Sequence, residues 1–143
     1  MRIDASYTYP AAPAQVWARL LDPESLRACI PGCEALESIG PDRWNARLSV
    51  GAGPIRGTYT GAVAITGKRE PMSYTLEVEG RGSPGFVKGS AQVTLVPDGV
   101  GTRVDVVADG QVGGTVAAVG QRMLTGVARS LMGQFFDCLR SRL

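Results

Sequence analysis

Cys29-Ile30-Pro31-Gly32-Cys33 marks the place where the pattern of the chain changes. Before it, Pro13 and the segment Asp22-Pro23-Glu24 predict two short helices, because proline is tolerated in the first helical turn and an acidic side chain caps a helix start. After it, apolar and polar residues alternate as far as Gly110, which is the period of a β-strand. The Pro31-Gly32 turn therefore separates a short helical region from a long run of strands.

The strand pattern has an apolar side chain at every second position. It first occurs before the helices, at Ile3, Ala5, Tyr7 and Tyr9, and it returns as a run of six strands from Glu34 onward. The clearest sets lie at residues 44–50, 59–65, 74–78, 87–95 and 104–108. Turn signals at residues 40–42, 51–54, 70–71, 83–85 and 97–99 separate the strands. We therefore expect an antiparallel meander with one dry face.

The last segment changes to an apolar spacing of three and four residues. Its apolar stripe consists of Val116, Val119, Met123, Val127, Leu131, Phe135, Cys138 and Leu139. We expect one long helix from Gly113 to Leu143 that packs on the dry face of the sheet. This order resembles the START-like, helix-grip fold. That fold is α+β, with two short helices after the first strand and a curved antiparallel sheet of about seven strands wrapped on the C-terminal helix. Residues 1–143 are expected to form a single domain of this kind.

Composition excludes several classes of protein. With 143 residues, of which 44% are hydrophobic and 20% charged, the chain is long and apolar enough to fold around a core. A net charge of +2 and few aromatic residues argue against nucleic acid as a partner. The sequence has no apolar run of membrane-spanning length, and its start does not resemble a signal peptide, which predicts a soluble, cytoplasmic protein. Three cysteines, an odd number, favour a reducing compartment over a disulfide framework.

The sequence offers little catalytic or metal-binding chemistry. It has no histidine, so it has no Ser-His or Cys-His couple and lacks the commonest metal ligand. Acidic residues such as Glu77, Glu79 and Asp105 fall on predicted outward positions. We therefore predict no catalytic residue, no metal site and no covalent cofactor.

The cysteines of the pentapeptide have two interpretations. Cys29 and Cys33 are four residues apart and only Cys138 remains, which is too few thiolates for a structural zinc site. The simpler interpretation is that both are small buried residues around the turn. The functional interpretation is that Cys29, Pro31, Gly32 and Cys33 form one lip of a pocket mouth.

A pocket is suggested by small residues at predicted inward positions. They are Ala46, Gly57, Gly61, Gly89, Ala91 and Ala108, and the closing segment adds Gly120, Gly126 and Gly133. Glycine inside a helix costs up to about 1 kcal/mol relative to alanine, so these glycines need a reason. Room for an apolar ligand is one reason, and close backbone packing or strand bulges are the other. The sequence leaves both open.

If the small residues provide room for a ligand, the lining residues follow from the predicted register. They are Ile30, Trp44, Ala46, Leu48, Tyr59, Gly61, Val63, Tyr74, Leu76, Val87, Gly89, Ala91, Val116, Val119, Gly120, Met123, Val127 and Leu131. Substitution of Gly61 by leucine is then expected to fill the pocket and abolish ligand uptake while leaving the fold intact.

Several motifs, in this order along the whole chain, resemble the CoxG family, whose members are accessory proteins of carbon monoxide dehydrogenase. Besides the pentapeptide, they are Gly53-Pro54-Ile55-Arg56-Gly57-Thr58-Tyr59-Thr60-Gly61, Gly85-Phe86-Val87-Lys88-Gly89-Ser90-Ala91, Gly101-Thr102-Arg103, residues 113–124 and Phe135-Phe136. The resemblance implies an accessory protein of a molybdenum-containing CO dehydrogenase or related hydroxylase. It further implies a quinone or lipid held in an apolar cavity, and attachment of the enzyme to the cytoplasmic face of the membrane.

The closing helix also carries an excess of basic residues. Arg122, Arg129 and Arg140 are opposed by Asp137 alone among the acidic residues of the segment. A basic helix with surplus apolar residues suits an anionic lipid surface or an acidic partner protein. The alternative is a solvated helix back with no binding role.

Two other functions fit the same fold. Helix-grip domains include cyclases and hydrolases, and Tyr59 and Tyr74 are the inward residues able to polarise a carbonyl group. The other alternative is a pure adaptor, with a filled core, that works through its surface.

Overall fold

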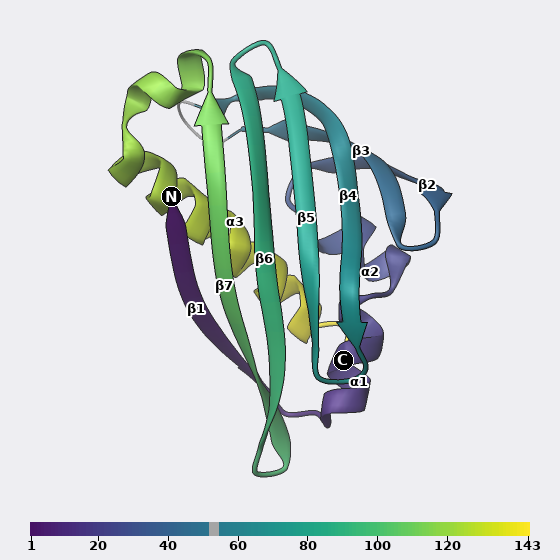
Figure 1. Ribbon diagram of the computed structural model, residues 1–143. Coiled ribbons are helices and arrows are strands. Elements are labelled where there is room, and N and C mark those ends of the chain that lie inside the picture. Colours follow the sequence, from purple (N-terminus) through teal and green to yellow (C-terminus); the bar gives the residue numbers. More distant parts are fainter. Residues whose placement is uncertain (52–54) are drawn as a thin grey trace.

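The computed structural model describes residues 1–51 and 55–143 and has the predicted α+β arrangement (Figure 1). A seven-stranded antiparallel sheet has the strand order β1-β7-β6-β5-β4-β3-β2. The strands are β1 (Arg2–Tyr9), β2 (Cys33–Gly40), β3 (Arg43–Val50), β4 (Gly57–Arg69), β5 (Ser73–Gly82), β6 (Gly85–Asp98) and β7 (Gly101–Gly113). The helical segments are α1 (Pro13–Leu20), α2 (Pro23–Cys29), η2 (Thr115–Val119) and α3 (Gln121–Arg140).

The alternating pattern placed the strands and their inward faces correctly. On β3 and β4 the buried residues Trp44, Tyr59, Val63 and Ile65 all belong to the predicted inward set. From β2 to β7, consecutive strands pair through short connections, as hairpin-length spacing requires, and β1 pairs with β7. The turn predicted at residues 51–54 lies, apart from Gly51, outside the described residues.

The two short helices begin as their sequences predict. Pro13 and Pro23 each occupy the first turn of a helix. The Asp22 carboxylate accepts a hydrogen bond from the backbone N–H of Glu24 at 3.3 Å, which caps the start of α2. On α1, Val16, Trp17 and Leu20 are buried against the sheet, so the amphipathic pattern of this helix is used for packing.

The expectation of one helix from Gly113 to Leu143 is wrong at both ends. Strand β7 continues to Gly113, residues 115–119 form the 3-10 helix η2, and α3 begins only at Gln121. Gly114 and Gly120 have φ angles of 81° and 93°, in the left-handed region that favours glycine. Gly114 lies between β7 and η2, and Gly120 separates η2 from α3. The apolar spacing continues across these breaks, which is why periodicity alone did not reveal them.

The core lies toward one end of the sheet, which we call the closed end. There α1 and the last turns of α3 meet the inward face, and Tyr9, Trp17, Tyr74 and Leu139 belong to one buried cluster. The opposite end, which we call the open end, is where β7 leads into η2 and where β5 turns into β6 (Figure 1). The difference between these two ends of the same face positions the candidate site.

Candidate ligand-binding site

The inner surface of the open end is apolar but not sealed. Seven inward or sheet-facing apolar side chains are only half-buried there and neither belong to the core cluster nor pack against it. They are Leu48, Val50, Val87 and Val112 on the sheet and Leu124, Val127 and Leu131 on α3. Apolar surface left in water costs about 25 cal/mol per Å² relative to burial. An apolar molecule between α3 and the sheet would cover these side chains.

The strand register brings the small inward residues together. Gly61 on β4 lies between Ala46 on β3 and Gly80 on β5. One step closer to the closed end, Gly89 on β6 lies opposite Gly110 on β7. We call these five residues the small-residue band, since they lie on five neighbouring strands. Toward the open end, the next inward residues after Ala46, Gly89 and Gly110 are the half-buried Leu48, Val87 and Val112.

Two members of the band, Gly80 and Gly110, are not among the residues predicted from the sequence. Gly80 follows Tyr74, Leu76 and Val78 in the same inward register, so the alternation along β5 contained the signal. Gly80 is identified as a neighbour of Gly61 only by the register between β4 and β5. The alternating pattern within each strand does not specify that register.

The glycines of the band exist for two different reasons. A Cβ atom added at Gly61 would collide with the backbone of β5 at Glu79 and Gly80, so this glycine permits two strands to approach closely. A Cβ at Gly80 would find its nearest atoms, the Thr60 carbonyl oxygen and Tyr59 Cβ, at 3.9 Å, which is ordinary contact. Gly61→Leu therefore cannot leave the fold intact, and that expectation is wrong. Gly80 provides room for a side chain.

The predicted lining residues divide by burial. Trp44, Tyr59, Val63, Tyr74 and Val116 are buried, Gly120 and Met123 are exposed, and the other eleven residues of the predicted lining are half-buried. Val116 lies on η2, not on α3, and its backbone N–H donates to the Pro84 carbonyl at 2.8 Å. That contact fastens η2 to the β5–β6 turn at the open end.

The pentapeptide connects α2 to β2, and its two cysteines differ in their bonding. Cys29 forms a disulfide with Cys138 of α3, with a Cα–Cα distance of 5.3 Å. Cys29 is buried, as the simpler interpretation expected, but its bond to Cys138 was not predicted from the sequence. Cys33 is free and half-buried, and it pairs in register with inward-facing Leu48. Cys33, rather than Cys29, thus lies beside the predicted lining.

The backbone of this turn is tightly constrained. Gly32 has a φ angle of 75°, and an added Cβ would collide with the Ser49 carbonyl. The Gly32 carbonyl accepts a hydrogen bond from the Ser49 N–H at 2.9 Å. Glycine is thus needed here because the turn lies directly against the β3 backbone at Ser49.

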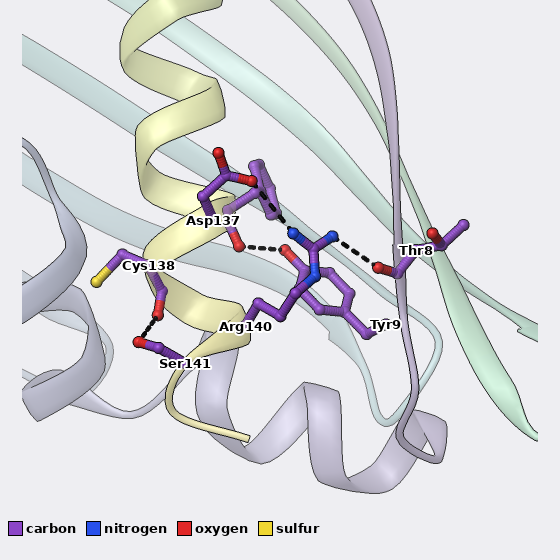
Figure 2. Close-up of polar contacts among 7 residues, drawn as sticks. Thr8, Tyr9, Asp137, Cys138, Arg140 and Ser141 are labelled. Carbon is purple, nitrogen blue, oxygen red and sulfur yellow. Dashed lines mark hydrogen bonds and ion pairs between the residues drawn. The ribbon is translucent and has the colours of Figure 1, made fainter.

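Two of the three predicted surface arginines bind the edge of the sheet. Arg129 donates to the Asp4 carbonyl at 3.2 Å, and Arg140 donates to the Thr8 carbonyl at 2.9 Å, both on edge strand β1. Figure 2 shows Arg140 between Asp137 and Thr8, close to the ring of Tyr9. Arg122 is exposed and makes no hydrogen bond or ion pair with the described residues. These contacts give Arg129 and Arg140 a structural role.

The hydroxyl groups among the predicted lining residues are those of Tyr59 and Tyr74. Tyr59 donates to the Ile55 carbonyl at 2.8 Å, whereas the Tyr74 hydroxyl has no hydrogen bond to any described residue. Burial raises the pKa of both tyrosines above the ordinary value of 10.0, so both remain neutral at physiological pH. Across the described residues no group of three or more His, Cys, Asp or Glu side chains is arranged to hold a metal ion. The site is suited to binding an uncharged, mostly apolar molecule.

The outer face of the sheet has two shallow hollows, of 590 and 570 Å³. Charged side chains of both signs surround them, including Glu37, Arg47 and Arg81 around the first. Gly61 and Gly80 also border the first hollow, because the sheet is thin where both residues lack side chains. A polar rim of mixed charge does not match an apolar ligand, so we assign the candidate site to the inner face.

Comparisons with known proteins agree with this fold and with the family resemblance. The family model for CoxG, a subunit of carbon monoxide dehydrogenase, matches residues 7–143. Among curated proteins, no sequence matches the chain.

Solved structures share the fold over nearly the full length. A conserved protein from Geobacillus kaustophilus is 36% identical, with a TM-score of 0.96 over 99% of this chain and 94% of that one. A START superfamily protein from Mycobacterium smegmatis is 14% identical, with a TM-score of 0.76 over 99% of this chain and 95% of that one. The protein TTHA0849 from Thermus thermophilus is 16% identical, with a TM-score of 0.71 over 99% and 96% of the two chains. The helix-grip, START-like prediction of the fold is confirmed.

Proposed function

The chain belongs to the CoxG family of carbon monoxide dehydrogenase proteins, and we propose that it is a non-enzymatic accessory module that holds one long apolar molecule between α3 and the sheet. The isoprenoid quinones and the membrane lipids are the classes of ligand that we propose. The observation that carries the proposal is the inner surface of the open end, where half-buried apolar side chains on both walls face the small-residue band.

The size and chemistry of these walls support a long ligand over a small polar one. Each buried methylene group contributes about 0.8 kcal/mol, so a polyisoprenoid or acyl chain gains affinity along its whole length. The band is inward on five strands, and consecutive strands lie about 4.8 Å apart. Its width across the strands is therefore about 19 Å, which suits an extended chain better than a compact metabolite.

We further propose that the partner is a molybdenum-containing, CO-dehydrogenase-type enzyme, and that the module serves it at the cytoplasmic face of the membrane. The described part of the chain includes no helix that is both long and apolar enough to cross a membrane. Contact with the membrane would then be peripheral. We assign it to two residues at the start of α3: Arg122, and Met123, which is 53% exposed.

The first test is chemical identification of the ligand. The protein, purified without detergent, is extracted with organic solvent and the extract is analysed by mass spectrometry. A stoichiometric quinone or lipid is the expected result. An empty extract, combined with no uptake of added decylubiquinone, would contradict the proposal and favour a surface adaptor.

A pair of leucine substitutions on β5 tests the position of the site. Gly80→Leu places a side chain on the inner face where a Cβ has room, and it is expected to weaken decylubiquinone uptake about tenfold through overpacking. Glu79→Leu adds the same side chain at the neighbouring, exposed position and should leave uptake unchanged. Equilibrium binding to both variants is compared, with unfolding curves as a control. Loss of binding in Glu79→Leu alone would move the site to the outer hollows.

A further inference from the structure

The outer face of the sheet has a trough whose two walls carry opposite charge. Its floor is β4, where the outward residues Ala62 and Ala64 are small and alternate with the buried Val63 and Ile65. Arginines stand on the β3 side of this floor and glutamates on the β5 side, and both outer hollows border it. Since neighbouring strands lie about 4.8 Å apart, the backbones of the two walls are about 10 Å apart.

The charges of the trough are not used within the molecule. Arg43, Glu77 and Glu79 are exposed, and none of them forms an ion pair with a described residue. Helices α1 and α3 pack on the inner face, so no described element covers the trough (Figure 1). One solvated face is ordinary for an antiparallel sheet, so only the arrangement of the charges can identify a partner.

The strand register arranges the outward residues in rows that cross the trough. One row consists of Arg43, Ala64 and Glu77 on β3, β4 and β5, and the next consists of Glu37, Asn45, Ala62, Glu79 and Lys88 on β2 to β6. A twofold axis parallel to β4 exchanges the two sides of the trough and leaves the position along the strands unchanged. Each row is then laid, reversed, on the same row of a second copy.

Reversal places unlike groups against each other. Arg43 of one copy faces Glu77 of the other, and by symmetry this contact occurs twice. In the next row Asn45 faces Glu79, so an amide donor meets a carboxylate acceptor. Farther from the axis, Glu37 on β2 faces Lys88 on β6. The two rows are therefore self-complementary.

We propose that two copies of this chain associate through their outer sheet faces, about a twofold axis parallel to β4. The small floor residues leave space for the long wall side chains of one copy to extend over β4 of the other. Stacked sheets pack about 10 Å apart with their strands nearly aligned, which is the arrangement that this axis generates. An axis across the strands would instead lay β3 on β3 and β5 on β5, and like charges would oppose it.

The proposed interface is small and contains one unfavourable row. Arg47 of each copy faces Arg81 of the other, although Arg47 already forms an ion pair with Glu34 at 3.3 Å. The three rows extend about 19 Å across five strands and about 14 Å along them. That area is well below the roughly 800 Å² per partner of a standard interface, so we expect a weak dimer that forms at high protein concentration.

The axis also fixes how the two candidate sites are presented. Because it keeps both sheets pointing in the same direction along their strands, the two open ends lie at the same end of the dimer. Both α3 helices lie on its outside, away from the contact. Two cavities are thus offered to one surface, which strengthens attachment to a membrane or a large enzyme through bivalency. The dimer itself does not require a ligand, so it stands or falls separately from the proposed function.

Sedimentation equilibrium of the chain and its charge variants tests the pairing. At concentrations up to about 1 mM, the unmodified protein is expected to show a monomer–dimer equilibrium that weakens as salt is added. Arg43→Glu and Glu77→Arg, each alone, set like charges together at two places and should weaken dimerisation at least about tenfold. Arg81→Glu should tighten it about tenfold, because it replaces the one unfavourable contact, with Arg47, by an attractive one.

An equimolar mixture of the two weakened variants is the decisive control. In a mixed pair, the Arg43→Glu position of one copy faces the Glu77→Arg position of the other, and the unchanged Arg43 faces the unchanged Glu77. Both contacts are attractive again, so the mixture should dimerise although neither variant does so alone, which a folding defect could not produce. An unmodified protein that stays monomeric, or a mixture that does not associate, would overturn the proposal. A dimer insensitive to all three substitutions would also overturn it and indicate pairing through the β2 edge.

Discussion

At the scale of single residues, Gly61 and Gly80 lie opposite each other and yet have different roles. Gly61 allows the backbones of β4 and β5 to meet, whereas Gly80 leaves space above the sheet. Close packing therefore explains Gly61, whereas the space at Gly80 is compatible with the proposed ligand. The roles of these two paired glycines can be distinguished only by the atoms that surround each of them.

Alanine substitutions at this pair should separate the two roles. Gly61→Ala is expected to lower the free energy of unfolding by about 1–3 kcal/mol, because its Cβ collides with the β5 backbone. Gly80→Ala should change that free energy by no more than about 0.5 kcal/mol. Urea denaturation of both variants gives the comparison. Equal stability of Gly61→Ala and the unmodified protein would contradict the close approach of the strands.

At the scale of elements, α3 is anchored at one end. Three contacts tie its last turns to α2 and β1: the Cys29–Cys138 disulfide, Arg140 on the Thr8 carbonyl, and the Tyr9 hydroxyl on the Phe136 carbonyl. Its first turn follows Gly120, which makes no side-chain cap. The half of α3 over the candidate cavity is therefore the less restrained half, and ligand entry needs that property.

Loss of the disulfide should release this anchor. Cys138→Ser is expected to reduce the free energy of unfolding by about 2–4 kcal/mol, since the bridge closes a loop with a sequence separation of 109. Cys33→Ser is the matched control, because Cys33 is free, and it should leave stability nearly unchanged. Both are measured by urea unfolding with and without reductant. A reductant that affects Cys138→Ser as much as the unmodified protein would contradict the pairing.

Much of the fold follows from local pattern, and the parts that do not are contacts between distant segments. Alternation identified β1 to β7, and Asp22 identified the start of α2. The Cys29–Cys138 pair and the Gly61–Gly80 neighbours depend on the tertiary arrangement, which no spacing in the sequence encodes. The break before α3 depends on the φ angles of Gly114 and Gly120, at positions where an apolar stripe continued without interruption.

At the scale of the whole molecule, the titratable groups of the interior are tyrosines. The chain has four tyrosines and no histidine. Burial is the largest cause of the raised pKa of Tyr7, Tyr9, Tyr59 and Tyr74. Stability should therefore vary little around neutral pH and respond mainly to alkaline conditions.

The direction of that response follows from proton linkage. Unfolded tyrosines lose their protons near pH 10.0, whereas the folded state keeps them to higher pH. The unfolded state then binds fewer protons, so the free energy of unfolding falls as pH rises above 10.0, by up to about 1.4 kcal/mol per pH unit for each tyrosine. Urea unfolding at a series of alkaline pH values measures the slope. Tyr74→Phe should reduce it, and an unchanged slope in that variant would contradict burial of the Tyr74 phenol.

The arginine contacts on β1 have a consequence for self-association. An open sheet has two edges, and an unprotected edge strand can recruit another chain by backbone pairing. Here Arg129 and Arg140 occupy carbonyls of β1, with α3 lying along that strand, so only the β2 edge is left to pair. Two copies can pair through their β2 edges about a twofold axis. The resulting dimer has no free edge through which a third copy could be added. The same two side chains that hold α3 in place thereby oppose growth of the sheet into a fibre through its β1 edge.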